Sequence, residues 1–151
     1  MATQVITNPL GAFGRSTGNE VNFQTVAPLE AAAAISAGDL VAVAASVNTD
    51  TTVTVETLDV SDALPELVLG VAKNAAAAGE IVEVVVHGYA ICNIGSTSPA
   101  MGNIVIIGAS DGVAGVLAPA VAGTITGDNF GVYLGTEIGS TNQAAIWFSK
   151  F

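Results

Sequence analysis

The chain has 151 residues, of which 51% are apolar and 5% aromatic, so one domain or two small lobes with a core of small side chains is expected. Only Arg15, Lys73 and Lys150 are basic, against 13 acidic residues, and the formal net charge is −10. Nucleic-acid and anionic membrane partners both require clusters of Lys and Arg, so neither is expected here.

The first twenty residues, MATQVITNPLGAFGRSTGNE, keep no helical or strand periodicity for long and are rich in Gly, Asn, Ser and Thr. This composition predicts a flexible, extended N-terminal arm over 1–20, with a plain disordered terminus as the alternative. The segment has neither a basic region nor a continuous apolar run, so we expect no signal peptide. The apolar stretch 101–125 contains Asp111, Pro119 and five glycines, which argues against a membrane helix. A soluble protein made in the cytoplasm is therefore expected.

Strand patterns dominate residues 21–151, which we expect to form one β-rich domain. Short apolar or alternating segments are bounded by Gly, Asn, Asp or Pro, as in all-β domains. These segments are 21–27, 39–45, 51–60, 67–72, 80–91, 103–108, 129–135 and 144–151. The predicted fold class is all-β, a compact sandwich or barrel-like domain.

One short helix is expected in this otherwise all-β domain. PLEAAAAIS (28–36) has Pro28 near its first turn and Glu30 at the positive end of the helix dipole. The alanine run 75–78 fits either a helical turn or a loop. Gly112 and Gly115 are expected to turn a hairpin between NIVIIG and VAGVLAP.

A weak internal repeat divides the domain into two related β half-repeats, approximately 37–91 and 101–151. AGDLVAV (37–43) resembles MGNIVIIG (101–108) and places Gly38 opposite Gly102. ELVLGVA (66–72) resembles GVYLGTE (131–137) and places Gly70 opposite Gly135. AAAGEIV (76–82) repeats the pattern of AGDLV (37–41), in which a small residue and Gly are followed by an acidic residue and two apolar residues. Chance recurrence in a Gly- and Val-rich chain is the alternative.

The single histidine, His87, and the single cysteine, Cys92, lie five residues apart in EIVEVVVHGYAICNIG (80–95). Side chains alternate in a strand, so the two are expected on opposite faces unless Gly88 forms a bulge. Five residues also separate their α-carbons by about 16 Å at about 3.3 Å per residue. Cys92 is predicted to be a buried apolar residue and His87 a surface or interface residue, not a catalytic pair.

Other catalytic or cofactor sites find little support in the pattern, and no catalytic residue or cofactor is predicted. One His and one Cys exclude the usual zinc sites, and no GxSxG, P-loop or dinucleotide-binding motif occurs. The acidic run lacks EF-hand spacing and is best interpreted as a solvated loop, with a carboxylate-based hydrolase as a weak third hypothesis. Its members are Asp50, Glu56, Asp59, Asp62 and Glu66.

Three phrases together resemble the head-decoration, or capsid cement, proteins of tailed bacteriophages. They are the Gly-acid-Leu-Val phrase at 38–41, the Gly-Val-Ala phrase at 70–72 and the phrase AGEIVEVVVHG at 78–88. The likeness covers 36–108 best and the C-terminal third loosely. The long arm and the very low basic content depart from shorter members of the family.

The resemblance implies a β-rich, non-enzymatic, homo-oligomeric protein, with a trimer favoured, on the outside of the virion capsid. Its implied partner is the major capsid protein, whose subunit contacts it would stabilise. Candidate capsid-docking residues of the arm are Val5, Ile6, Phe13 and Arg15. Candidate subunit-interface residues are Trp147, Phe148 and Phe151, for which a core role is an equal alternative.

A second class of function is a carbohydrate- or receptor-binding β-module of a virion or cell-surface fibre. Trp147 and Tyr133 are the candidate sugar-contacting residues in that case. The sequence leaves this alternative open.

Overall fold

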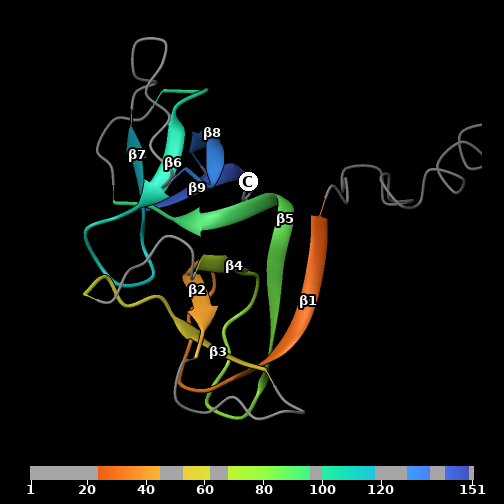
Figure 1. Cartoon of the computed structure of the whole chain (residues 1–151). Helices are drawn as coiled ribbons and strands as arrows, with labels where there is room; N and C mark the ends of the chain where they lie inside the picture. Colours follow the sequence, from red (N-terminus) through yellow and green to blue (C-terminus); the bar gives the residue numbers. More distant parts are fainter. Residues whose placement is uncertain are drawn as a thin grey trace, which may run out of the picture.

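A computed structural model describes residues 24–44, 53–61, 68–95, 100–117, 129–136 and 142–149 (Figure 1). These residues form β-strands, turns and loops and contain no helix, which confirms the all-β prediction. The strands are β1 (Gln24–Ala31), β2 (Leu40–Val43), β3 (Thr54–Thr57), β4 (Val68–Ala72), β5 (Ile81–Asn93), β6 (Ile104–Ile107), β7 (Ala114–Leu117), β8 (Gly131–Thr136) and β9 (Gln143–Phe148).

The nine strands form one sheet in the order β1-β3-β2-β4-β5-β9-β8-β6-β7, with an additional pairing of β1 and β5. That pairing closes the first five strands into a barrel, as the barrel-like prediction required. β1 and β3 run parallel, and the other paired strands run antiparallel. The remaining four strands extend the sheet and return to the end of β5, where Ile94 bridges Ala114.

The sheet shows the same strand order twice. There are two sets of four antiparallel strands, β3-β2-β4-β5 and β7-β6-β8-β9, and the strands are hydrogen-bonded in the same relative order in each set. The antiparallel pair of β5 and β9 joins the two sets. β5 is 13 residues long and bends between its two halves (Figure 1). It pairs with β1 and β4 before the bend and with β9 after it. The proposed boundaries of the half-repeats, 37–91 and 101–151, stay a prediction.

Two groups of buried side chains fill the fold. The smaller group belongs to the barrel alone and consists of Ala31, Ile35, Val41, Val55, Ala72, Ala76, Val82 and Val84. The larger group joins barrel residues such as Leu40, Val71 and Val85 to Phe130, Tyr133, Ile146 and Phe148 of the second set of strands. Because one continuous core spans both sets, the barrel and β6–β9 pack as one body.

One type of turn recurs at three strand starts, at 36–39, 77–80 and 100–103. In each turn the third residue is a glycine with a positive φ: 89° at Gly38, 80° at Gly79 and 88° at Gly102. These values match a type II turn, which favours glycine at that position. The side chain of the fourth residue accepts a hydrogen bond from the first residue's N–H, at 3.0 Å for Asp39 to Ser36, 2.8 Å for Glu80 to Ala77 and 2.9 Å for Asn103 to Ala100.

The register of the strands corrects one part of the predicted repeat. Gly70 pairs with Val41 of β2, and Val105, the corresponding residue of β6, pairs with Gly131 and not with Gly135. At both Gly70 and Gly131 an added Cβ would overlap the carbonyl oxygen of the next strand, that of Val85 or that of Trp147. Glycine is therefore required where the two strands approach closely.

The predicted helix over 28–36 is wrong, because β1 continues to Ala31. Gln24 to Glu30 pair with β5, and this tertiary pairing overrides the weak helix preference of a short alanine run. Pro28 is tolerated because β1 pairs with β3 only from Glu30 onward. Residues 75–78 form a turn and an isolated bridge from Ala76 to Ile35.

The apolar stretch beginning at Met101 supplies β6 and β7. Gly112 turns the hairpin with a φ of 67°, whereas Gly115 lies within β7 opposite Ile106. Within the described ranges there is no helix long and apolar enough to cross a membrane.

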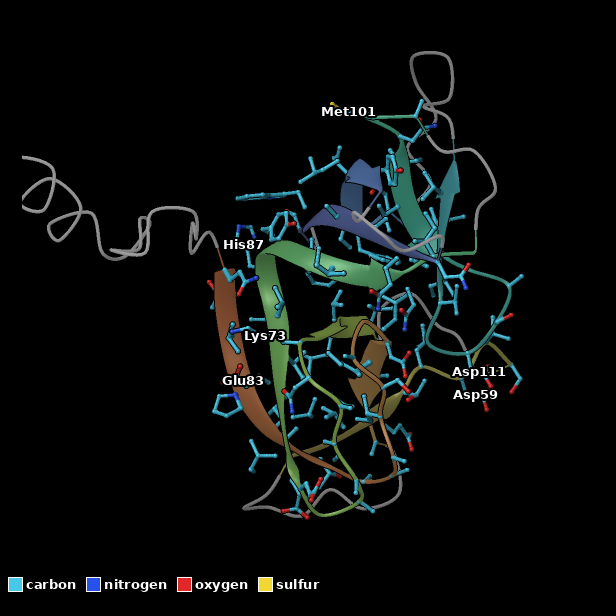
Figure 2. All side chains as sticks on the ribbon, turned by 180° about the vertical axis from the view of Figure 1, so that it is seen from behind. Asp59, Lys73, Glu83, His87, Met101 and Asp111 are labelled. Carbon is cyan, nitrogen blue, oxygen red and sulfur yellow. The ribbon has the colours of Figure 1, made fainter. Side chains whose placement is uncertain are left out.

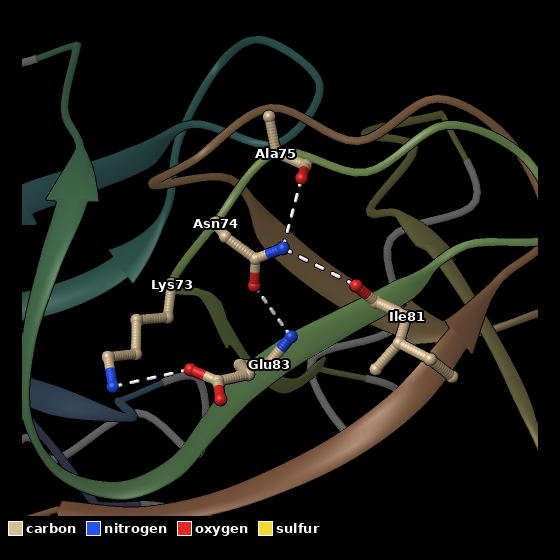
Figure 3. A network of polar contacts seen from close by, with 5 residues as sticks. All are labelled: Lys73, Asn74, Ala75, Ile81 and Glu83. Carbon is tan, nitrogen blue, oxygen red and sulfur yellow. Dashed lines mark hydrogen bonds and ion pairs between the residues drawn. The ribbon is translucent and has the colours of Figure 1, made fainter.

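The connection from β4 to β5 is held by the side chain of Asn74 (Figure 3). Its Oδ1 accepts a 2.8 Å hydrogen bond from the Glu83 N–H, and its Nδ2 donates to the carbonyls of Ala75 and Ile81 at 3.0 and 3.4 Å. The neighbouring ion pair of Lys73 and Glu83, at 3.3 Å, is about half exposed on both sides. The amide, which bonds three backbone groups, is the stronger constraint.

A second polar cluster joins the first turn to β5 and β9. Asn93 donates from Nδ2 to Asp39 at 2.8 Å and accepts at Oδ1 from Gln143 Nε2 at 3.1 Å. Asp39 also accepts from Ser36 N and from Thr57 Oγ1 at 3.4 Å. The turn at 36–39 is thereby fixed directly to β3 and β5, and through Asn93 to β9.

Candidate interaction surface

His87 and Cys92 do not form a site together. His87 is exposed and meets the ring of Trp147 edge-on, with centroids 5.9 Å apart. Cys92 is completely buried, and this burial raises the pKa of its thiol to about 12. The predicted alternation along the strand fails at Val85, which is buried, because the pairing with β1 shifts by one residue beside Val86.

The acidic run gives no clustered site in the part of the chain that the structure describes. Asp50, Asp62 and Glu66 lie outside the described residues. Asp59 accepts hydrogen bonds from the N–H and hydroxyl of Ser61, at 2.7 and 2.6 Å, which is a local turn. No group of three His, Cys, Asp or Glu side chains among the described residues is placed to hold a metal ion.

The predicted arm over 1–20 lies outside the described residues, and so do its candidate docking residues Val5, Ile6, Phe13 and Arg15. The same holds for the candidate interface residue Phe151.

The two other interface candidates, Phe148 and Trp147, lie on opposite faces of β9. Phe148 is completely buried and packs against Phe130 with ring centroids 5.8 Å apart, so its position supports the core alternative. Trp147 is partly exposed on the opposite face of β9. Tyr133, a candidate sugar contact, is only 3% exposed and belongs to the core.

The charged side chains that the structure describes are distributed unevenly. Among the described residues, Asp, Glu and Lys occur only in the barrel, in the loop after β3 and at the tip of the β6–β7 hairpin. They are Glu30, Asp39, Glu56, Asp59, Lys73, Glu80, Glu83 and Asp111. Figure 2 shows Glu83 on barrel strand β5 near Lys73, which directly follows β4, and Asp59 beside Asp111, with Met101 at the far end of the molecule. Strands β6–β9 carry no charged residue.

The same uncharged part has apolar side chains on both faces of its sheet. One face belongs to the core, and we call the other the outer face. Its apolar residues are Tyr89, Ile91, Ile104, Ile106, Val132, Ala145 and Trp147, all partly or largely exposed. The same face also carries the uncharged polar residues His87, Asn93 and Gln143 at its margin. An antiparallel sheet with one solvated face normally places polar residues on that face, so an apolar outer face indicates an interaction surface.

Sequence reasoning identified only Trp147 of this face. One signal was present in NIVIIG (103–108), where four successive apolar residues supply both faces of β6. The grouping of Tyr89, Val132 and Ile104 beside Trp147 depends on strand order, which local patterns do not reveal.

Two comparisons by sequence gave no relatives: no protein-family model matches the chain, and no curated protein matches it. Solved structures do match the fold. One is a chain of the capsid of Myoviridae phage XM1, with a TM-score of 0.56 and 18% identity over 85% of this chain and 84% of that chain. Another is the N base of the head fibre gp8.5 of bacteriophage phi29, with a TM-score of 0.56 and 17% identity over 84% of this chain and 95% of that chain. The chain therefore shares its fold with proteins of phage heads.

Proposed function

We propose that this chain is a structural virion protein that binds the outside of a phage capsid and stabilises contacts between major capsid subunits. The observation that carries the proposal is the fold, which two phage head proteins share over more than four fifths of the chain. The phrases at 38–41, 70–72 and 78–88, which resemble capsid cement proteins, support the same class. We further propose that it acts by binding as a homo-oligomer, with a trimer favoured, and has no catalytic role.

The mechanism of stabilisation is thermodynamic. A protein that binds the assembled shell and not its free subunits shifts the equilibrium toward the shell. Many copies add their effects through multivalency, even when each contact is weak. The net charge of −10 favours the outer surface over the DNA-filled interior, where phosphate would repel it.

The test is co-sedimentation of the full-length chain with capsids of the parent phage that lack this protein, at several salt concentrations. Saturable binding at a fixed number of copies per capsid is expected. Heating the decorated and undecorated capsids then measures the stabilisation, expected as a higher disruption temperature. Absence of binding at every salt concentration would refute the proposal.

The arm is the proposed contact with the capsid, through Val5, Ile6, Phe13 and Arg15. Deleting residues 2–18 is expected to weaken co-sedimentation while the circular dichroism spectrum and melting temperature stay unchanged, since β1 begins at Gln24. The matched control is a double alanine substitution at Ser16 and Thr17, which changes the arm but keeps all four docking residues, and it is expected to bind like the wild type. An unfolded deletion product would instead place the arm in the core.

A carbohydrate- or receptor-binding role is the second candidate, favoured by the fold shared with a head-fibre base. The test is a glycan array followed by titration of Trp147 fluorescence. Quenching by a defined sugar, together with no binding to capsids, would favour this role over the first.

A further inference from the structure

The outer face carries a continuous row of large side chains. Tyr89 of β5 lies directly opposite Trp147 of β9, Trp147 opposite Val132 of β8, and Val132 opposite Ile104 of β6. Neighbouring strands lie about 4.8 Å apart, so the row crosses four strands over about 14 Å. Ile91 and Ala145 form a second opposed pair beside it.

We propose that this outer face is the surface through which copies of the chain associate with one another. The inference deepens the proposed function, in which the chain acts as a homo-oligomer, by naming the surface that joins its subunits. It predicts self-association in solution, without any capsid.

The charge distribution favours a second copy of the chain as the partner that binds the outer face. Each copy carries a net charge of −10, so most contacts between copies would bring acids together and repel. The outer face lies on β6, β8, β9 and the half of β5 after Gly88, none of which carries a charged residue, whereas the described acids lie on the barrel, the loop after β3 and the tip of the β6–β7 hairpin. Copies that meet through this face bury none of the carboxylates that the structure describes.

The composition of the face also fits a permanent interface. Transient interfaces are about as polar as the rest of a protein surface, whereas the interfaces of homo-oligomers are more apolar and resemble a core cut in half. The outer face contains no charged group, and its central row has Trp147 and Tyr89, residue types that are enriched at interface centres.

The decisive variant is Val132→Lys, in the middle of the row, where Val132 is 39% exposed. Its matched control is Val43→Lys, on barrel strand β2, where Val43 is 37% exposed. Both lower the net negative charge by one, so general repulsion falls equally in both. If the outer face is the interface, only Val132→Lys places an unpaired charge in it, and its dissociation constant is expected to rise at least about a hundred-fold.

Self-association is measured by sedimentation equilibrium of the full chain, with melting temperature as the check of folding. Val132→Thr is the milder variant, because it keeps the shape and strand preference of valine, and about ten-fold weaker association is expected from its hydroxyl. The only tryptophan, Trp147, reports on the same face: its emission is expected to shift to longer wavelength as the wild type is diluted.

A wild type that stays monomeric at every concentration overturns the inference, and so does a Val132→Lys variant that associates like the wild type. Equal weakening by Val43→Lys would also overturn it. Capsid co-sedimentation is scored separately, so a failure of self-association is distinguished from a failure to bind capsids.

Discussion

Gly70 and Gly131 show how a single residue fixes the distance between two strands. Each lies where its α-carbon faces the carbonyl of the next strand, that of Val85 or that of Trp147. The sequence indicated that glycines recur, but it paired Gly70 with Gly135, since the phrase LG is common to both segments. Only the register of β2 with β4 and of β6 with β8 identifies the equivalent residue.

Alanine at Gly131 is expected to lower the free energy of unfolding by about 1–3 kcal/mol, because the added carbon would lie 2.6 Å from the Trp147 carbonyl oxygen. Gly70→Ala is expected to cost at least as much. Chemical denaturation measures both. The control is Gly95→Ala, whose nearest contact is a side-chain carbon of Val113 at 3.3 Å, and a change within about 0.5 kcal/mol is expected there.

The buried thiol of Cys92 makes stability depend on alkaline pH. Its ordinary pKa is 9.0, and burial raises the folded-state pKa to about 12, with a smaller contribution in the same direction from the Asp39 carboxylate and an opposing hydrogen bond to the backbone of Ala114. Below pH 9 the thiol is protonated in both states and its contribution to stability is fully present. Between pH 9 and pH 12 only the unfolded chain loses the proton, so the contribution falls as pH rises.

We expect this thiol alone to lower the free energy of unfolding by about 1.4 kcal/mol per pH unit over that interval. Urea denaturation at several pH values measures the slope, and Cys92→Ala provides the comparison, since the two proteins share every ionisable group except this thiol. Equal slopes in the two proteins would show that the thiol ionises freely in the folded state.

At the scale of elements, much of the fold follows from local pattern. Each of the eight predicted segments contains or overlaps one observed strand, because turn residues and apolar runs mark strand ends directly, and the ninth strand, β7, is the second strand of the hairpin expected after NIVIIG. The helix expected over 28–36 failed because Pro28 to Glu30 pair with β5, more than fifty residues away in sequence, and Ala31 pairs with Val55 of β3. The outer face could not be predicted either, since it combines strands that pair only across long separations.

The three recurring turns should differ in their contribution to stability according to what else the fourth residue contacts. Asp39→Ala removes hydrogen bonds to Ser36, Thr57 and Asn93, so a loss of about 2–3 kcal/mol is expected. Asn103→Ala removes a partly buried bond to Ala100, and about 1 kcal/mol is expected. Glu80→Ala removes an exposed bond to Ala77 and is expected to cost least. Thermal or urea denaturation gives the order, and an order with Glu80 first would contradict it.

At the scale of the whole molecule, the salt dependence of self-association distinguishes an apolar interface from one held by ion pairs. Raising the salt concentration from about 0.01 M to about 0.1 M shortens the screening length from about 30 Å to about 10 Å. Because each copy carries −10, association through the uncharged outer face should strengthen with salt. Sedimentation equilibrium at the two concentrations measures this, and weaker association at the higher salt would indicate ion pairs at the interface instead.

The bent strand β5 has a consequence for how the molecule comes apart. Gly88 pairs with Gln24 of β1 and with Phe148 of β9, so the same peptide segment completes the barrel and begins the second set of strands. Neither part can melt while the other keeps β5 in place. Heating should therefore give a single calorimetric transition whose van't Hoff and calorimetric enthalpies agree, and backbone amides of β5 should be among the last to exchange with deuterium.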